Sequence, residues 1–304
     1  MSVVTDPARP AVVEAPGKPP ARRRGSFGFN TVSPREKVVR YLLLAFVLLI
    51  TIGPFLWQLS TSLKGSGEDI YTRIPRLLPS QPTFSHYKEV TDTIPVLDYA
   101  RNSLVVAVLV VGGNVIGASL AGFAISRLQF RGRRIVLGLF LATLVLPGEV
   151  TIISQYVTVR EFGLANTLVG VALPGMIGAL NVLLMYNAFR ALPLEVDQAA
   201  IVDGANAWQR FVYVALPSVR GTISVIAIFA FIGAWDDFLW PLIVLTDPNR
   251  LTLQVALAQL NVGHNTDYSM VMAGVLMASV PMVAVFALFA RGFIAGATEG
   301  ALRG

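Results

Sequence analysis

The chain has 304 residues, of which 54% are hydrophobic and only 14% are charged, and this composition excludes an ordinary soluble domain of this size. The net charge of +6 does not indicate a nucleic-acid partner, because the basic residues fall in short runs between apolar segments, as topology signals of a membrane protein do. There is no cysteine, which excludes disulfides, thiol chemistry and Cys-ligated metals.

The N-terminal segment differs in character from the rest of the chain. Residues 1–36 are rich in Pro, Ala and Arg and contain no sustained apolar run, so we predict a disordered basic cytoplasmic tail followed by a membrane domain over residues 37–304. The first apolar segment has 23 uncharged residues between Arg40 and Lys64. It is too long and starts too late for a cleaved signal peptide, so we expect a retained transmembrane helix.

Six apolar segments are long enough to cross the roughly 30 Å hydrocarbon layer, which needs about 20 helical residues. The predicted fold class is therefore an all-α membrane protein with six transmembrane helices. Two of the segments contain acidic residues, and the fourth lies somewhere inside its range. The predicted segments cover residues 41–63, 102–126, 135–155, 162–189, 221–242 and 268–290.

The distribution of Lys and Arg predicts the orientation of these segments. With the N-terminus inside, 17 of the 24 basic residues fall on the cytoplasmic side, and five of the other seven lie in one long outer loop. This bias predicts that both termini are cytoplasmic (N-in, C-in). The outer loop over residues 64–101 contains four prolines, so we expect an irregular connector there.

The polar stretch from Leu192 to Pro217 interrupts the apolar segments on the cytoplasmic side. Pro193 suits a first helical turn, and Glu195 and Asp197 suit the positive end of a helix dipole, which predicts a short helix over residues 193–202. The next two residues, Asp203 and Gly204, should stop that helix. Beyond them a second short helix is expected, with Asn206 as its N-cap and Pro217 as its end.

Acidic residues within two predicted spans are the strongest signal for a solute path, because a carboxylate in a membrane is costly and usually faces protein or water. If the helices are continuous, Glu149 and Asp236 lie about 22 to 24 Å from the cytoplasmic edge, at 1.5 Å per residue. Asp237 follows directly. These acids either line the outer vestibule of a solute path, or lie in the outer headgroup layer because Pro147 or Pro241 breaks the helix.

Motifs of common enzyme classes are absent from the sequence. No GxxxxGK[ST], GxGxxG or GxSxG occurs, and the two histidines, His86 and His264, lack HExxH or other ligand spacing. We therefore expect neither catalysis nor a metal site, and no cofactor bound by this chain.

The Leu192 to Pro217 stretch resembles the EAA loop of bacterial ABC importer permeases, whose pattern is EAA-x3-G-x9-I-x-LP. The sequence Gln198-Ala199-Ala200, three residues, Gly204, nine residues, Val214, one residue, Leu216-Pro217 matches this spacing throughout. It departs at Gln198, where the family has Glu, and at Val214, where it usually has Ile. Further stretches are similar to the second permease of carbohydrate importers of the maltose-permease type, the binding-protein-dependent transport inner membrane components: residues 101–104, 124–132, 162–167 and 235–242.

The resemblance implies a multi-pass subunit of the bacterial cytoplasmic membrane, surrounded by lipid, that imports a sugar or sugar-like solute. Its implied partners are a second permease in a heterodimer, a dimer of ATPase subunits that hold the ATP and Mg²⁺, and an extracytoplasmic solute-binding protein. The resemblance implies that the solute-binding protein contacts Asn261, Gly263 and His264. The implied ATPase-coupling residues are Glu195, Gln198, Ala199, Ala200, Asp203, Gly204, Leu216 and Pro217.

One alternative from a different class stays open at this point. A proton-coupled secondary transporter would use Glu149, Asp236 or Asp237 as its proton site. Such carriers often contain internal repeats and acids near the middle of the membrane, whereas this sequence has no evident repeat and its acids are predicted near the outer edge.

Overall fold

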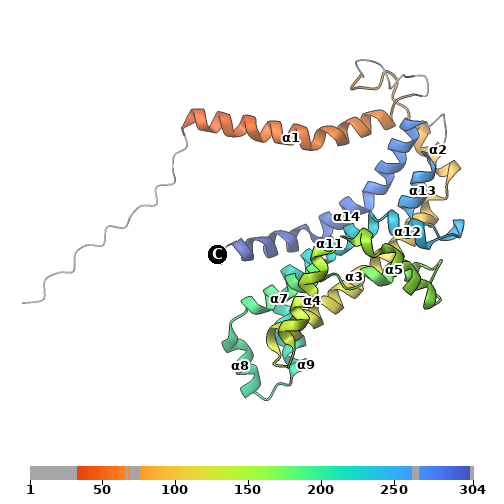
Figure 1. Cartoon of the computed structure of the whole chain (residues 1–304). Helices are drawn as coiled ribbons and strands as arrows, with labels where there is room; N and C mark the ends of the chain where they lie inside the picture. The colour runs from red at the N-terminus through yellow and green to blue at the C-terminus, as the bar shows by residue number, and fades with distance from the viewer. Residues whose placement is uncertain (1–32, 66–67, 69–75, 262–266, 302–304) are drawn as a thin grey trace, which may run out of the picture. The chain divides into compact units, whose positions relative to one another are not determined.

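A computed structural model describes residues 33–65, 68, 76–261 and 267–301, and for residues 291–301 it describes the backbone alone. The regular structure within these ranges is entirely helical (Figure 1). The chain divides into two units, residues 1–52 and 53–304. The prediction of an all-helical fold is therefore confirmed for the described residues.

The first unit contributes the beginning of α1 (Pro34–Ser62), a 29-residue helix that continues into the second unit. It begins at Pro34, so three residues of the expected N-terminal tail are helical. Its apolar side chains are exposed over most of the helix surface, including Leu42, Phe46 and Leu49. A helix that is apolar on all sides is suited to lipid or to other membrane helices.

The second unit is built on four helices: α3 (Val96–Arg127), α7 (Ala179–Ala191), α11 (Arg220–Trp235) and α14 (Tyr268–Ala301). Helix α3 packs against α7 and α11, and α14 packs against α11. Helices α1, α3 and the first 23 residues of α14 are long and apolar enough to cross a membrane by themselves. They correspond to three of the predicted segments.

Close packing between α3 and the segment before α7 depends on two glycines. A Cβ on Gly113 would lie 2.6 Å from the Cβ of Met176, and one on Gly117 would lie 2.8 Å from Ile177 Cγ1. Both distances are shorter than a van der Waals contact, so a larger residue would force the segments apart. The GxxxG pair of this helix therefore serves packing within the chain.

Three of the expected spans are bent or broken. Helix α4 (Arg133–Val145) is followed by α5 (Gly148–Glu161) at an angle of 109°. Leu146 is extended and Pro147 has no N–H to donate, so the helix ends there. Of the two alternatives left open by the sequence, the structure shows the one in which Pro147 breaks the segment over residues 135–155. A bend of 46° separates α7 from the segment formed by α6 (Leu168–Ala172) and η1 (Leu173–Gly175). The third, expected over residues 221–242, is broken after Trp235, where α11 ends, and helix α12 begins at Leu239.

The expected irregular connector after Lys64 is also corrected. It contains the helix α2 (Ser85–Thr93), which packs against α14 and buries Val90 completely. The four prolines lie outside this helix, which is why their number did not prevent it from forming. Three short elements complete the second unit: α12 (Leu239–Val244), η3 (Pro248–Arg250) and α13 (Leu253–Gln259).

Candidate functional site

The first half of the polar loop is the helix α8 (Leu194–Val202), with two acids in its first turn, as predicted. It begins one residue later than expected, because Pro193 is the N-cap and not part of the first turn. The helix ends at Asp203. Gly204 follows with a φ of +82°, in the left-handed region that glycine adopts without steric cost. Among the described residues, no atom lies within 4 Å of the position that a Cβ on Gly204 would take.

The second half of the loop consists of α9 (Ala207–Gln209), the π-helix η2 (Arg210–Ala215) and α10 (Leu216–Ser218). Asn206 is the predicted N-cap: its Oδ1 accepts the Gln209 N–H at 2.9 Å, and the Gln209 side chain accepts the Asn206 N–H at 2.9 Å. The expected end at Pro217 was wrong, because Pro217 lies in the first turn of α10, where no N–H is needed. The π-turn was not predicted either.

An ion pair joins the two halves of the loop. Arg210 Nη1 donates to Asp197 Oδ2 at 2.8 Å, and their side chains are only 11% and 18% exposed. Asp197 comes from the first turn of α8 and Arg210 from the start of η2. The thirteen-residue separation is not a spacing that places two side chains on one helix face, so the sequence analysis did not detect this pair.

Arg127 at the end of α3 fastens the loop to the long helices. Its Nε donates to the carbonyl oxygen of Phe189 at 3.0 Å, and its Nη2 donates to the same oxygen and to that of Leu192 at 2.6 Å. These carbonyls lie at the C-terminal end of α7, where the last carbonyls of a helix lack their usual partners four residues on. The Phe189 oxygen also accepts from the Leu192 N–H at 3.2 Å. The guanidinium therefore positions the chain where it leaves α7 for the loop.

An aromatic cluster makes a second link between the loop and the long helices. Phe211 of the π-turn is 6% exposed, and its ring centroid lies 5.2 Å from that of Phe123 and 6.4 Å from that of Phe189. Phe123 belongs to α3 and Phe189 to α7. A movement of the loop must therefore displace a ring that is packed between these two helices.

The outward surface of the loop is apolar although it is exposed. Gln198 and Ala199 are exposed in the middle of α8. Large apolar side chains are exposed around them, with exposed fractions of 50 to 86%. They are Leu194, Val196, Ile201, Val202, Trp208 and Tyr213. A concentration of exposed apolar side chains with a polar group among them is typical of a protein interface.

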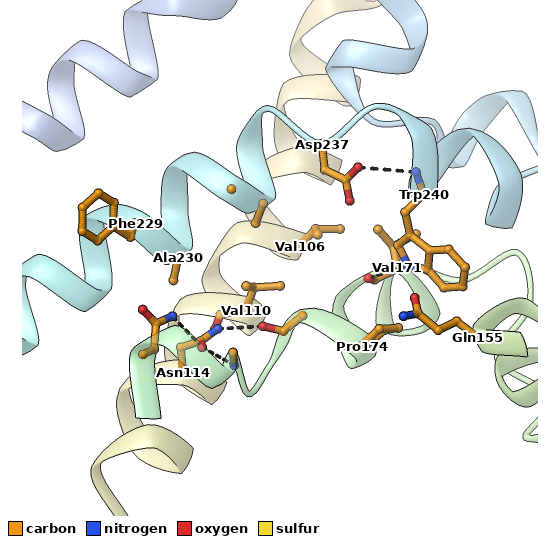
Figure 2. A pocket seen from close by; sticks show the side chains of 15 residues that line it. Val106, Val110, Asn114, Gln155, Val171, Pro174, Phe229, Ala230, Asp237 and Trp240 are labelled. Atoms are coloured by element: carbon orange, nitrogen blue, oxygen red, sulfur yellow. Dashed lines mark hydrogen bonds between the residues drawn. The ribbon is translucent and has the colours of Figure 1, made fainter. Parts of the chain in front are cut away.

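A cavity of about 340 Å³ lies among α3, α5, the α6–α7 segment, α11 and α12 (Figure 2). Four polar side chains line it: Asn114, Gln155, Asn181 and Asp237. Asn114 donates to the carbonyl oxygens of Val110 and Gly175 and accepts from the Gly178 N–H and from Asn181 Nδ2 at 2.8 Å. The Oδ1 of Asn181 is buried and has no hydrogen-bond partner among the described protein atoms.

The amides of this cavity were missed by the sequence analysis, which considered only charged residues in the spans. Asn114 and Asn181 did carry a signal, since each is an uncharged polar residue inside an otherwise apolar window. The other side chains that line the cavity are mainly apolar and include the aromatic residues Phe229 and Trp240. Trp240 closes one side of the cavity and donates its Nε1–H to the carbonyl oxygen of Val171 at 3.0 Å.

Of the three predicted acids, the structure brings only Asp237 to the cavity. Its Oδ1 accepts from the Trp240 N–H at 3.4 Å (Figure 2). Asp236 is exposed and accepts from Gln254 Nε2 at 3.3 Å. Glu149 is exposed in the first turn of α5, after the break at Pro147, so the depth estimated from a continuous helix does not apply to it.

The predicted contact region for a binding protein is described only in part. Asn261 is exposed just after α13. Gly263 and His264 lie outside the described residues.

Comparison with known proteins identifies relatives that are transport permeases. At the level of sequence, the chain is 30% identical over 273 residues to the diacetylchitobiose uptake system permease protein NgcG of Streptomyces coelicolor, covering 88% of this chain and 90% of that protein. It is 31% identical to the galactooligosaccharides transport system permease protein GanQ of Bacillus subtilis (87% and 94% covered) and 32% identical to the inner membrane ABC transporter permease protein YcjP of Escherichia coli (87% and 95% covered).

At the level of structure, the fold resembles that of a chain in the crystal structure of a bacterial ABC transporter involved in the import of the acidic polysaccharide alginate. The TM-score is 0.75 at 22% identity, with 84% of this chain and 96% of that chain covered. Residues 113–293 match one family throughout. This protein belongs to the family of binding-protein-dependent transport system inner membrane components.

Proposed function

We propose that this chain is a permease subunit of an ATP-driven, binding-protein-dependent importer, and that its solute is a sugar or sugar-like molecule. The observation that carries the proposal is the loop over residues 192–217, in which two short helices meet at a glycine elbow and present an exposed apolar surface. Such a surface suits a partner ATPase subunit, which would hold the ATP and Mg²⁺. This chain would bind no cofactor and catalyse no reaction.

The proposed solute class is supported by the relatives and by the cavity. Two of the relatives are named as permeases for diacetylchitobiose and for galactooligosaccharides. In the cavity, Asn114, Asn181 and Gln155 supply amide groups, which can donate to and accept from hydroxyl groups. Trp240 supplies an apolar surface of the kind on which a sugar ring can pack.

The geometry also suggests how closure of an ATPase dimer would reach the cavity. The Asp197–Arg210 ion pair lets α8 and the second half of the loop move as one body. Phe211 then transmits this movement to α3 and α7, which carry the cavity residues Asn114 and Asn181. Because the core between these helices is close-packed, a small displacement at the loop would shift the helices relative to each other.

In this proposal the chain crosses the bacterial cytoplasmic membrane six times, with both termini inside. Three helices are long enough to span alone, and up to six spans result if each bent pair is one span. The permease would form a heterodimer with a second permease, and the outer loop that includes Asn261 would contact the solute-binding protein. Reporter fusions after Arg131 and Trp208 should give cytoplasmic signals, and a fusion near Pro79 an outside signal.

The experiment that tests the function is uptake by vesicles that contain the purified complex. Labelled oligosaccharide should accumulate only with ATP and the solute-binding protein present. Family membership and the presence of only one predicted acid at the cavity both favour this reading over the proton-coupled alternative. Uptake that follows a proton gradient without the ATPase, and that is lost in Asp237→Asn, would overturn the proposal.

A further inference from the structure

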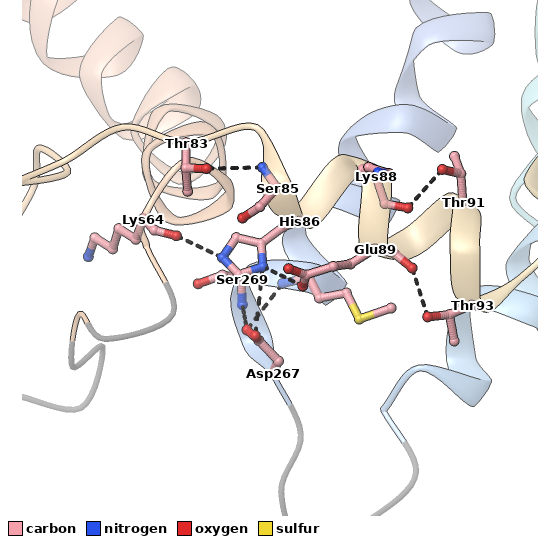
Figure 3. A network of polar contacts seen from close by, with 11 residues as sticks. Lys64, Thr83, Ser85, His86, Lys88, Glu89, Thr91, Thr93, Asp267 and Ser269 are labelled. Carbon is pink, nitrogen blue, oxygen red and sulfur yellow. Dashed lines mark hydrogen bonds and ion pairs between the residues drawn. The ribbon is translucent and has the colours of Figure 1, made fainter.

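A buried histidine lies far from the coupling loop, on α2. The side chain of His86 is completely buried, and its Nε2 lies 2.8 Å from the carbonyl oxygen of Lys64 (Figure 3). A carbonyl oxygen can only accept, so Nε2 must carry the hydrogen of this bond. The other ring nitrogen, Nδ1, is then the atom available to bind something else.

Nδ1 faces two carboxylates. It lies 3.1 Å from Glu89 Oε2 and 3.7 Å from Asp267 Oδ2, and the three potential ligand atoms lie within 4.8 Å of one another. In the neutral ring with hydrogen on Nε2, the lone pair of Nδ1 would point at two anions, which is unfavourable. A proton or a metal ion must therefore lie between these atoms.

Two of the three side chains, those of His86 and Asp267, are positioned by hydrogen bonds that do not use the ligand atom. The bond from Nε2–H to a backbone carbonyl is the usual way in which a metal-binding histidine is oriented. Asp267 uses Oδ1 to accept the N–H groups of Ser269 and Met270 at the start of α14, so its Oδ2 remains for the cluster. Glu89 reaches the same point from three residues along α2.

Access from solvent is provided by the two acids. The side chains of Glu89 and Asp267 are 47% and 42% exposed, whereas His86 is buried. An ion can therefore reach the cluster and keep water in a remaining coordination position. One imidazole and two carboxylates suit Zn²⁺ with a fourth ligand from water, whereas Mg²⁺ and Ca²⁺ prefer sites made only of oxygen ligands.

We propose that His86 Nδ1, Glu89 and Asp267 form a Zn²⁺ site, completed by water. The ion would join the helix α2, which carries His86 and Glu89, to Asp267 at the start of α14. The hydrogen bond from His86 Nε2 to the carbonyl oxygen of Lys64 would connect the peptide after α1 to the same site. No metal site was expected from the sequence, because neither histidine shows HExxH or other ligand spacing and Asp267 lies 181 residues after His86. Only the packing of α2 against α14 brings Asp267 to His86.

The test uses the full complex, purified through a tag that contains no histidine, stripped with a chelator and titrated with ZnCl₂. The variants are Glu89→Gln and Asp267→Asn, which keep side-chain size and hydrogen-bonding capacity but remove an anionic ligand. The control is Asp92→Asn, an exposed acid on α2 outside the cluster. Zinc content by mass spectrometry, Zn²⁺ affinity by calorimetry and Tm with and without Zn²⁺ are measured.

We expect the unmodified complex and the Asp92→Asn complex to bind one more Zn²⁺ per copy of this chain than either cluster variant does. Both cluster variants should lose affinity about tenfold or more, on the scale found for disturbed metal sites, and should lose the rise in Tm that Zn²⁺ causes. Equal amounts of MgCl₂ or CaCl₂ should not raise the Tm. Equal zinc content and affinity in all four complexes would overturn the proposal and leave a proton as the cation at His86.

Discussion

Substitutions at Gly204 test whether transport depends on the backbone geometry of the coupling-loop elbow. The residue has a φ of +82°, and the position that a Cβ would take has no described atom within 4 Å. A Cβ at this position would therefore meet no obstacle among the described residues. The cost of a substitution must come from backbone strain alone, or from contact with a partner subunit.

Backbone strain and contact with a partner predict different orders of severity among substitutions at Gly204. For an ordinary L-residue the left-handed conformation costs about 1 to 2 kcal/mol, Asn tolerates it better than most, and β-branched residues tolerate it least. Strain therefore predicts that Gly204→Asn is the mildest change, Gly204→Ala is intermediate and Gly204→Val is the most severe. Contact with a partner would instead follow side-chain size, so that Ala is mildest and the similarly sized Asn and Val are equally harmful.

The assay is uptake in vesicles, measured together with membrane abundance and with ATPase activity stimulated by the binding protein. A cost of 1 to 2 kcal/mol corresponds to a population change of about 5- to 30-fold, so Gly204→Val should lose most of its transport if the coupled conformation is affected. Abundance should change little, because the elbow is exposed and outside the core. Normal uptake by Gly204→Val, or an order that follows size, would refute the reasoning.

Three further substitutions test other parts of the molecule. Gln198→Glu should tighten assembly with the ATPase and make assembly more sensitive to salt. The reason is that a charged hydrogen bond contributes about 1.5 to 3 kcal/mol, against about 0.5 to 1.5 kcal/mol for a neutral one. Identical retention of the ATPase by both versions of the complex, at low and at high salt, would contradict this. Arg210→Met should lower the Tm by leaving Asp197 unpaired, and adding Asp197→Asn should restore part of the loss in a double-mutant cycle. Asn181→Leu should reduce uptake while the complex still assembles, because the substitution removes the unpartnered amide oxygen of the cavity. Unchanged uptake kinetics would exclude this side chain from the solute path.

The sequence alone was sufficient for features that depend on neighbouring residues. The long apolar helices α3 and α14 follow from windows without charge, and the two-helix loop follows from Pro193, Gly204 and Asn206, whose effects act within a turn or two. The same holds for the spacing that indicated the permease family. These signals are local, so they can be read without knowing which helices meet.

Features that depend on which segments meet were decided only by the tertiary structure. The ion pair between Asp197 and Arg210, the amides around the cavity and the meeting of His86 with Asp267 all join residues far apart in sequence. The sharp turn after α4 is an intermediate case, since Pro147 signalled a possible break but not its 109° angle. The sequence pattern of one helix predicts whether that helix is apolar on one face or on all faces. The side chains of the neighbouring helices then determine which polar groups of the helix gain a hydrogen-bond partner and which are left to bind a solute or an ion.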